Sequence, residues 1–341
     1  MIVRLEKIRT AVVGMGYWGP KFARNFLQHP QFELVAAVDL DIDKAKDQVN
    51  RLGASNVKVY QNLDELFQEH ELDLAHVAVP PQAHFEISHR FLENRVSVLV
   101  EKPVGLNMVD REELVRTAKE NRVHLLVDHT YMFTSEFEEM YGLVQNKQIG
   151  NPIFYNSTRI NLGLIQTDTT VVEDLAVHDI ALLDGLLGKL PIYVTCSGIT
   201  VSPSRVTSTA FATITYSHGF VAQLLISWNS SVKVRQIQLA GSLGMITWDD
   251  MAGSEKIKIF NSRIDEVLSD EDVRISYHLG EGRIPSVISA EAIRKELNYL
   301  FEVISKGMPE PLNGPEHILR VGKILEALKL SLNLNGEKVL L

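Results

Sequence analysis

Short apolar runs alternate with amphipathic segments along the first third of the chain. The runs are rich in valine, as is typical of strands buried on both faces of a parallel sheet, and they lie at Thr10–Val13, Leu34–Val38, Val57–Tyr60, Leu74–Val79, Val96–Val100 and Val123–Val127. Apolar residues recur at helical spacing between them, in Pro20–Gln28, Lys44–Leu52, Leu63–Glu69, His84–Glu93 and Arg111–Asn121. This alternation predicts right-handed βαβ units and an α/β fold with an open, doubly wound parallel sheet.

The pattern changes after about residue 128. Helical periodicity at Ser135–Asn146 and Glu173–Leu187 flanks a strand-like run at Ile153–Ile160. Turn residues then separate successive strand-like runs at Ile192–Thr200, Ala210–Tyr216, Phe220–Trp228, Val234–Ala240 and Met245–Trp248. Two helical segments, Ala290–Ser305 and Pro315–Asn333, end the chain. We therefore expect two domains: residues 1–127, and an α+β domain at 128–341 with a large, mainly antiparallel sheet.

Composition excludes several classes of protein. The chain has 341 residues and a net charge of −9, so it lacks the clustered positive charge that a nucleic-acid backbone requires. Cys196 is its only cysteine, which rules out an intrachain disulfide. No apolar run approaches the length of a membrane span, and Met1–Lys7 is unlike a signal peptide. We expect a soluble, cytoplasmic protein with neither nucleic acid nor a membrane as partner.

A glycine-rich turn follows the first apolar run, with the sequence Gly14-Met15-Gly16-Tyr17-Trp18-Gly19. In a dinucleotide-binding turn the first glycine allows a tight bend, the second admits a pyrophosphate, and the third lets the helix pack on the strand. Asp39 ends the second run twenty residues later, where a carboxylate accepts hydrogen bonds from ribose hydroxyls and repels a 2′-phosphate. The pattern favours NAD over NADP. The alternative is a glycine turn that binds no ligand.

Two further segments end strands at the same carboxyl edge. Val79 and Pro80, with His84 nearby, are expected to contact the cofactor, although such residues also occur in ordinary strand-to-helix turns. Glu101-Lys102-Pro103 follows the fifth run. A lysine there can place a positive charge against a reacting oxygen as alkoxide character develops. The alternative is a solvated surface lysine.

Asp174 and His178 lie four residues apart on the helix predicted at Glu173–Leu187. At that spacing two side chains share one helical face, and a carboxylate beside an imidazole fixes its tautomer and raises its basicity. This is the equipment of a general base, although such pairs also occur on ordinary helix surfaces. Glu173, His178 and Asp179 are all metal-ligand types, but they point in different directions around a helix. We therefore expect no metal site.

A polar strip precedes that helix, consisting of Asn156, Thr158, Arg159, Asn161 and the segment from Thr167 to Thr170. These side chains could bind the hydroxyl groups of a substrate, or they could form a solvated strand edge. His76 lies inside an apolar run and is expected to be a core residue with its hydrogen bonds satisfied. His129, which closes the sixth run, is compatible with either role.

Together these features resemble the glucose–fructose oxidoreductase and inositol dehydrogenase family, also written Gfo/Idh/MocA. The matching residues run over nearly the whole chain: Gly14, Gly16, Gly19, Asp39, the Glu101-Lys102-Pro103 triplet, Asp174 with His178, Phe301, Gly314 and the helix through Ser331. The segments Arg159–Gly163 and Asp174–Asp179 look most like members associated with sugar or nucleotide-sugar metabolism. Many relatives carry glycines just before the catalytic helix, where this chain has Val171-Val172-Glu173, so the substrate remains open.

The resemblance implies a Rossmann domain followed by an α+β domain whose open sheet face commonly makes subunit contacts. It implies Lys102, Asp174 and His178 as the catalytic residues. The cofactor-binding residues would be Gly14, Met15, Gly16, Tyr17, Trp18, Gly19, Asp39, Val79, Pro80, His84, Glu101 and Lys102. The substrate-binding residues would be Lys102, Arg159, Asn161, Asp174 and His178.

The expected function is NAD-dependent hydride transfer to or from a ring secondary alcohol of a sugar, polyol or nucleotide sugar. His178 would act as the general base and Lys102 would polarise the oxygen. The alternative is a catalytically silent regulator of the same fold that binds NAD or NADP. We also expect a homodimer or homotetramer.

Overall fold

The computed structural model describes residues 7–163, 169–201, 206–268, 273–287, 290–310 and 312–341. The chain folds into two compact units. Met1–Phe133 and Ala290–Gly322 form the first unit, and Thr134–Ser289 and Lys323–Leu341 form the second. The sequence predicts a single division between residues 127 and 128. The structure differs by assigning a late segment, which includes helix α8 (Ala292–Lys306), to the first unit.

A six-stranded sheet forms the centre of the first unit, in the order β3-β2-β1-β4-β5-β6, and all neighbouring strands are parallel. Its strands are β1 (Ile8–Val13), β2 (Phe32–Val38), β3 (Lys58–Tyr60), β4 (Leu74–Val77), β5 (Ser97–Glu101) and β6 (Leu125–Asp128). Its connecting helices are α1 (Gly19–Gln28), α2 (Ile42–Arg51), α3 (Leu63–Glu69), α4 (His84–Glu93) and α5 (Met108–Asn121). This confirms the predicted doubly wound α/β fold. The strand order reverses between β1 and β4, which is where such sheets leave a crevice for ligands.

Alternate residues of these strands face opposite sides of the sheet. One face packs against α3, α4 and α5 through Val13, Ala75, Val98 and Leu125. The other face packs against α1, α2 and α8 through Val12, Leu74, Leu99 and Leu126. Both faces are therefore covered, which explains why the runs are almost continuously apolar.

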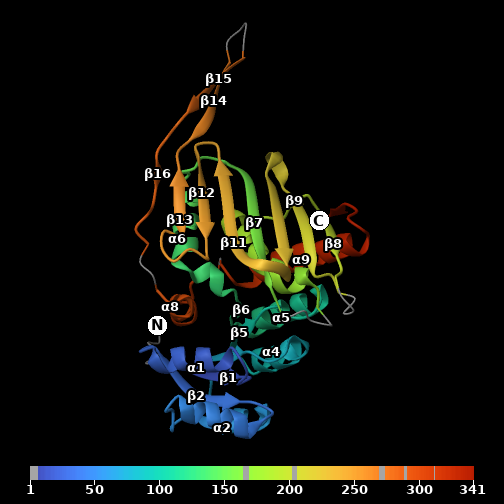
Figure 1. The fold of residues 1–341 in the computed structure, drawn as a ribbon. Helices are drawn as coiled ribbons and strands as arrows, with labels where there is room; N and C mark the ends of the chain where they lie inside the picture. Colours follow the sequence, from blue (N-terminus) through green and yellow to red (C-terminus); the bar gives the residue numbers. More distant parts are fainter. Residues whose placement is uncertain (1–6, 164–168, 202–205, 269–272, 288–289, 311) are drawn as a thin grey trace. The chain divides into compact units, whose positions relative to one another are not determined.

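Helix α8 completes the second of these faces. Its buried residues, Ile293, Leu297, Leu300 and Val303, recur at helical spacing and join the same core as Phe22 and Phe26 of α1. Polar contacts accompany this packing: Arg24 pairs with Glu291, and the Nε2 atom of His29 lies 3.0 Å from the Oδ1 atom of Asn298. Figure 1 shows α8 next to α1. The chain thus returns to the first unit to cover part of its sheet.

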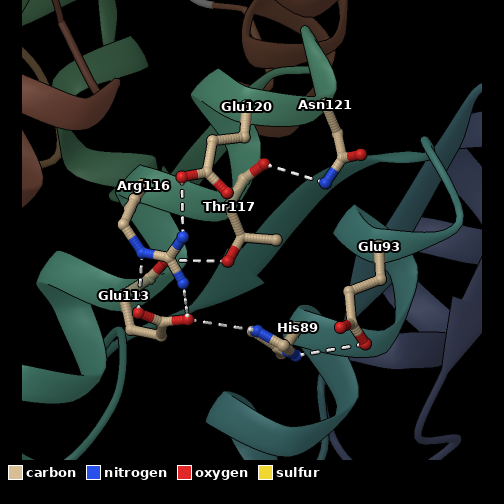
Figure 2. A network of polar contacts seen from close by, with 7 residues as sticks. All are labelled: His89, Glu93, Glu113, Arg116, Thr117, Glu120 and Asn121. Atoms are coloured by element: carbon tan, nitrogen blue, oxygen red, sulfur yellow. Dashed lines mark hydrogen bonds and ion pairs between the residues drawn. The ribbon is translucent and has the colours of Figure 1, made fainter.

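Helices α4 and α5 lie side by side on the opposite face and share an exposed polar network, shown in Figure 2. The ring of His89 lies 3.3 Å from Glu93 and 3.5 Å from Glu113. Arg116 pairs with Glu113 and also with Glu120, and the Arg116 hydrogen bond lowers the pKa of Glu113. Because water screens such exposed pairs, the network adds little to stability.

A nine-stranded sheet dominates the second unit, in the order β16-β13-β12-β11-β7-β10-β9-β8-β17. Its strands are β7 (Pro152–Leu162), β8 (Tyr193–Ile199), β9 (Thr209–Thr215), β10 (Val221–Ser227), β11 (Asn229–Gly241), β12 (Gly244–Asp249), β13 (Ile257–Phe260), β16 (Gly282–Arg283) and β17 (Val339–Leu340). Only the β7–β10 pair is parallel among these neighbours. The prediction of a large, mainly antiparallel sheet is confirmed.

One face of this sheet is buried and the other is open. Along β9, Ala210, Ala212 and Ile214 are buried, whereas the side chain of Phe211 points the other way and is 51% exposed. The helices of this unit are α6 (Ser135–Gln145), α7 (Val177–Leu187) and most of α9 (Pro315–Asn333). Strands β14 (Arg263–Leu268) and β15 (Val273–His278) form a separate hairpin that extends beyond the sheet (Figure 1). No helix in the described part of the chain is long and apolar enough to cross a bilayer.

Candidate functional site

The glycine-rich turn joins β1 to α1 and is tightly packed at two of its three glycines. Gly14 has a φ of +93°, and a Cβ there would lie 2.4 Å from the carbonyl oxygen of Ala78. A Cβ on Gly19 would lie 1.9 Å from the carbonyl oxygen of Gly14. At Gly16, by contrast, no atom lies within 4 Å of the added carbon. Gly14 and Gly19 therefore pack closely against the backbone of the same unit, whereas the space beside Gly16 is open, as the approach of a pyrophosphate requires.

A cleft of about 710 Å³ opens beside this turn in the first unit. The predicted cofactor residues that line it are Gly14, Gly16, Tyr17, Trp18, Asp39, Val79 and Pro80. The Asp39 carboxylate is fixed at its wall, because Oδ2 accepts a hydrogen bond from the Met15 N–H at 2.7 Å and Oδ1 accepts one from the Asp41 N–H at 3.0 Å. Met15 itself is fully buried, so its side chain belongs to the core. The volume of the cleft lies within the range of cofactor sites in general, and its wall presents a carboxylate as hydrogen-bond acceptor.

Sequence reasoning missed several polar residues of the cleft wall: Lys44, Gln61, Asn62, Glu86 and Arg90. The ammonium of Lys44 lies 3.7 Å from Asp39 Oδ2. Asp41 caps α2 by accepting a hydrogen bond from the Lys44 N–H at 3.0 Å, which places Lys44 in the first helical turn. That cap was readable from the sequence and would have located Lys44. Arg90 comes from α4 and pairs with Asp64, a contact with no local sequence signal.

His84 is buried, and both of its ring nitrogens contact backbone carbonyl oxygens. Its Nδ1 atom lies 2.8 Å from the carbonyl oxygen of Pro103, and its Nε2 atom lies 2.8 Å from that of Val79. Burial lowers the pKa of this ring. His84 thus connects the segment that follows β4 with the segment that follows β5.

Lys102 follows β5 and is half-buried, and its peptide bond to Pro103 is cis. The preceding Glu101 is buried and pairs in register with Asp128 of β6. Burial, followed by the Asp128 carboxyl, raises the pKa of Glu101 well above its usual range. The Glu101 side chain is therefore held in the interior, whereas Lys102 occupies the strand end.

The second unit holds Asp174 and His178 at the start of the predicted helix, but the local geometry differs from that prediction. Residues Val172–Ala176 form a turn of π-helix, and α7 begins only at Val177. The indole Nε1–H of Trp228, which follows β10, donates a hydrogen bond to Asp174 Oδ2 at 3.1 Å. Trp228 is nearly fully buried, so this hydrogen bond holds the Asp174 carboxylate against the protein interior. Sequence reasoning did not identify Trp228, because 54 residues separate it from Asp174.

The π-helical turn is also anchored by Glu173. Its Oε1 atom lies 2.7 Å from the ammonium of Lys329 on α9, and its Oε2 atom accepts hydrogen bonds from the N–H and hydroxyl of Thr170 at 3.0 Å. Burial raises the pKa of Glu173, but the hydrogen bonds from Lys329 and Thr170 outweigh it and lower the pKa overall. Glu173 therefore ties the π-helical turn both to α9, through Lys329, and to the residue that precedes the turn by two positions, Thr170.

Arg159 lies in β7 and is buried rather than solvated. Its Nε and Nη2 atoms donate to the two oxygens of Asp179 at 2.8 and 3.1 Å, and the Ser157 hydroxyl donates to Asp179 at 2.7 Å. This bidentate pair connects β7 to α7 directly beside His178. Asn161 is half-buried near the end of β7, whereas Thr167 lies outside the described residues.

His76, which the sequence places in the core, and His129, whose role the sequence leaves open, are both buried. The His76 ring stacks on Phe22 with 3.8 Å between centroids, but neither ring nitrogen has a hydrogen-bond partner among the described residues. The expectation of a satisfied core histidine is thus right about burial and wrong about hydrogen bonding. Burial lowers the pKa of His129 well below its usual range, and its ring lies 5.2 Å from that of His317.

The fold and the cleft define an α/β protein with a dinucleotide-binding unit and a second, sheet-based unit. Comparison with known proteins is in agreement. Residues 8–129 match the family model described as "Oxidoreductase family, NAD-binding Rossmann fold", and residues 137–247 match the "GFO/IDH/MocA C-terminal domain". These two segments cover most of both units. The chain therefore belongs to the Gfo/Idh/MocA family of oxidoreductases, and its first unit is an NAD-binding Rossmann domain.

Individual relatives support this assignment over most of the chain. An uncharacterized oxidoreductase of Streptococcus pneumoniae is 25% identical over 336 residues, covering 89% of each protein. UDP-N-acetylglucosamine 3-dehydrogenase of Acidithiobacillus ferrooxidans is 23% identical over 281 residues, covering 82% of this chain and 80% of the relative. Among solved structures, GenD2 from gentamicin A biosynthesis in complex with NAD superposes with a TM-score of 0.81 at 22% identity, covering 99% of this chain and 97% of GenD2.

Proposed function

We propose that this protein is an NAD-dependent dehydrogenase that transfers hydride between the nicotinamide and a ring secondary alcohol of a sugar, polyol or nucleotide sugar. The observation that carries the proposal is the firm anchoring of Asp174 by Trp228, one helical turn before His178, in a chain with a complete dinucleotide cleft. A carboxylate held in this way by a buried donor is suited to orienting an imidazole.

In this proposal His178 accepts the hydroxyl proton of the substrate, and Asp174 orients the ring and stabilises its positive charge. Lys102 binds the reacting oxygen and stabilises the alkoxide character that develops there. Arg159 positions α7 through its pair with Asp179, and Asn161 contributes a polar contact to substrate. The bound nicotinamide accepts or supplies the hydride.

The preference for NAD over NADP rests on Asp39. Its carboxylate is anchored by backbone N–H groups at the cleft wall, where it accepts hydrogen bonds from ribose hydroxyls and repels a 2′-phosphate. Lys44 and Arg90 also line the cleft, but each is paired with a carboxylate, Lys44 with Asp39 and Arg90 with Asp64. NADH is therefore expected to bind more tightly than NADPH, and tighter NADPH binding in a fluorescence titration would contradict this preference.

The substrate class is supported by the names of relatives that act on related compounds. UDP-N-acetylglucosamine 3-dehydrogenase matches 82% of this chain, and a myo-inositol 2-dehydrogenase of Thermotoga maritima is 24% identical over 187 residues, covering 53% of this chain and 55% of the relative. Both names describe oxidation of a ring alcohol. We infer a substrate with several ring hydroxyl groups and leave the carbon that reacts open.

The test is to follow reduced-nicotinamide absorbance while the protein meets NAD and a panel of polyols, free sugars and nucleotide sugars. His178→Asn should lower turnover by about 100-fold or more, because a general base contributes about 10²- to 10⁴-fold. The matched control is His218→Asn, an exposed histidine at a φ of +61°, a conformation that asparagine tolerates. Turnover of His178→Asn within about threefold of wild type would exclude His178 as the base. NADH binding without turnover on any substrate would favour the silent regulator.

A further inference from the structure

Four polar side chains converge on one face of the Rossmann sheet, beneath helix α8. His76 lies on β4, Glu101 ends β5, and Asp128 ends β6. The register pairs His76 with Leu99, two residues before Glu101, and pairs Glu101 with Asp128. Because side chains alternate along strands, these three residues share the face that carries Leu99 and Leu126. Glu296 projects from α8, which packs on the same face.

The four side chains form a compact, buried group. Potential ligand atoms of His76, Glu101 and Asp128 all lie within 4.8 Å of one another. Asp128 also contacts Glu296 at hydrogen-bonding range and accepts a hydrogen bond from the Thr130 hydroxyl at 2.7 Å. None of the four is more than 8% exposed. We call this group the β4–β6 cluster.

The β4–β6 cluster presents an electrostatic problem. Three carboxyl groups that share one dry site cannot all stay ionised without a cation, because the cost of burying unpaired charge is several kcal/mol per ion. Burial and the neighbouring carboxyl groups raise the pKa of Glu101 and of Glu296. Lys102 lowers the pKa of Glu101 and supplies one positive charge nearby, which is less than the cluster needs.

His76 is the independent indication that something other than protons is bound. Its ring is fully buried, and its two nitrogens have no hydrogen-bond partner among the described residues. Burial lowers its pKa to about 3, so the ring is neutral and offers a lone pair. A neutral imidazole left unpaired in the core is costly, whereas one that faces two carboxylates is a ready metal ligand.

We propose that His76, Glu101 and Asp128 form a structural binding site for one divalent transition-metal ion, with Glu296 supporting Asp128 from α8 and with Zn²⁺ as the cation that fits best. Imidazole nitrogen with carboxylate oxygen is a donor set that suits Zn²⁺, which binds His, Asp and Glu side chains in proteins. Three carboxylates and a divalent ion leave a net charge of −1, which Lys102 balances. The ion would join three neighbouring strand ends, and Glu296 beside Asp128 would link them to α8.

The first experiment is metal binding to the full chain. Protein stripped with a chelator is titrated with Zn²⁺ against a chromophoric indicator, and with Co²⁺ and Mn²⁺ as spectroscopic probes. The proposal predicts one ion per chain. His76→Gln removes a ligand and should weaken Zn²⁺ binding by about 100-fold or more, and Glu296→Gln should weaken it by about 10- to 100-fold, the range for a residue that supports a ligand. The control is His124→Gln, which removes a histidine that contacts Glu310 outside the cluster, and it should bind Zn²⁺ like wild type.

A second readout separates loss of a ligand from loss of folding. Metal-free Glu296→Gln replaces a buried carboxyl group with a neutral amide, so it should unfold at the same temperature as wild type or higher, while gaining less stability from Zn²⁺ than wild type does. Wild type should gain stability from Zn²⁺, and more so at higher pH.

Two results would overturn the proposal. The first is the absence of binding of Zn²⁺, Co²⁺ and Mn²⁺ to the stripped wild-type protein. The second is zinc binding that Glu296→Gln and His76→Gln leave unchanged. Either result would mean that the carboxyl groups of the β4–β6 cluster share protons instead. Neither depends on the dehydrogenase activity proposed above.

Discussion

Gly19 and Gly16 of the glycine-rich turn differ in the space around them, so substitution by alanine should affect stability at one position and cofactor binding at the other. At Gly19 an added methyl group would lie 1.9 Å from a backbone oxygen, so Gly19→Ala should lower the free energy of unfolding by several kcal/mol. At Gly16 an added methyl group meets no protein atom. Gly16→Ala should therefore leave the melting temperature within about 2 °C of wild type and weaken NADH binding by about tenfold or more. Equal effects of the two variants on stability would contradict this distinction.

The buried pair of Arg159 and Asp179 makes a second prediction at the residue scale. Arg159→Met leaves the Asp179 carboxylate buried without its charge partner, which should cost about 3–5 kcal/mol in urea unfolding. Replacing both residues, as in Arg159→Met with Asp179→Leu, should recover most of that loss because no charge is then stranded. A cost below about 1 kcal/mol for Arg159→Met would show that the pair is solvated.

Single residues were predictable from sequence where the fold repeats a local rule. Gly14, Gly16, Asp39, Val79 and Pro80 follow from strand–turn–helix order, and all of them line the cleft. Trp228, Lys329 and Glu296 were not predictable, because their partners Asp174, Glu173 and Asp128 lie far away in the sequence. Only the folded chain brings such pairs together.

Among the elements, sequence periodicity located the first six strands and five helices within a few residues, because buried apolar strands alternate regularly with amphipathic helices in this part of the chain. It did not reveal the π-helical turn at Val172–Ala176. That turn is set by tertiary contacts of Glu173 and Asp174 rather than by local propensity. It also did not reveal β13 to β17, because these strands are short or flank segments without a clear alternating pattern.

The anchor of the π-helical turn should be visible in the pH dependence of stability. The folded-state pKa of Glu173 is lowered from 4.5, so its carboxylate stabilises the protein above that pH, and this contribution is lost as the pH falls further. Glu173→Gln should lower stability by about 1–2 kcal/mol near pH 7, and the difference from wild type should shrink towards pH 3.5. Glu316→Gln, an exposed position on the same helix α9, is the control and should show no such trend. A difference that is constant with pH would exclude an ionised Glu173 anchor.

In the whole molecule, the order of the two units could be predicted from the sequence, but the assignment of the late segment to the first unit could not. The late segment Ala290–Gly322 belongs to the first unit because α8 supplies apolar residues that the α1 and α2 face of the sheet needs. A helical pattern near the end of a chain does not indicate which sheet it will cover. The β4–β6 cluster depends on the same return of the chain.

The open face of the large sheet should mediate self-association. Phe211 is 51% exposed there and pairs in register with Leu225 of β10. Wild type is expected to have the mass of a dimer or tetramer in light scattering, and Phe211→Glu should shift that mass towards the monomer. Val109→Glu, an exposed site on α5 of the first unit, is the control. A wild-type monomer at micromolar concentration would contradict the expectation.

Hydride transfer between the nicotinamide and a ring carbon can be followed directly with an isotope label. The protein is incubated with NADH that carries deuterium at the transferable position of the nicotinamide, together with ketone forms of the panel sugars and polyols. Mass spectrometry then locates the label. We expect deuterium on the new carbinol carbon of one substrate class, and strongly reduced transfer in His178→Asn. Label that stays on the nicotinamide with every compound, while NADH remains bound, would exclude hydride transfer to these substrates.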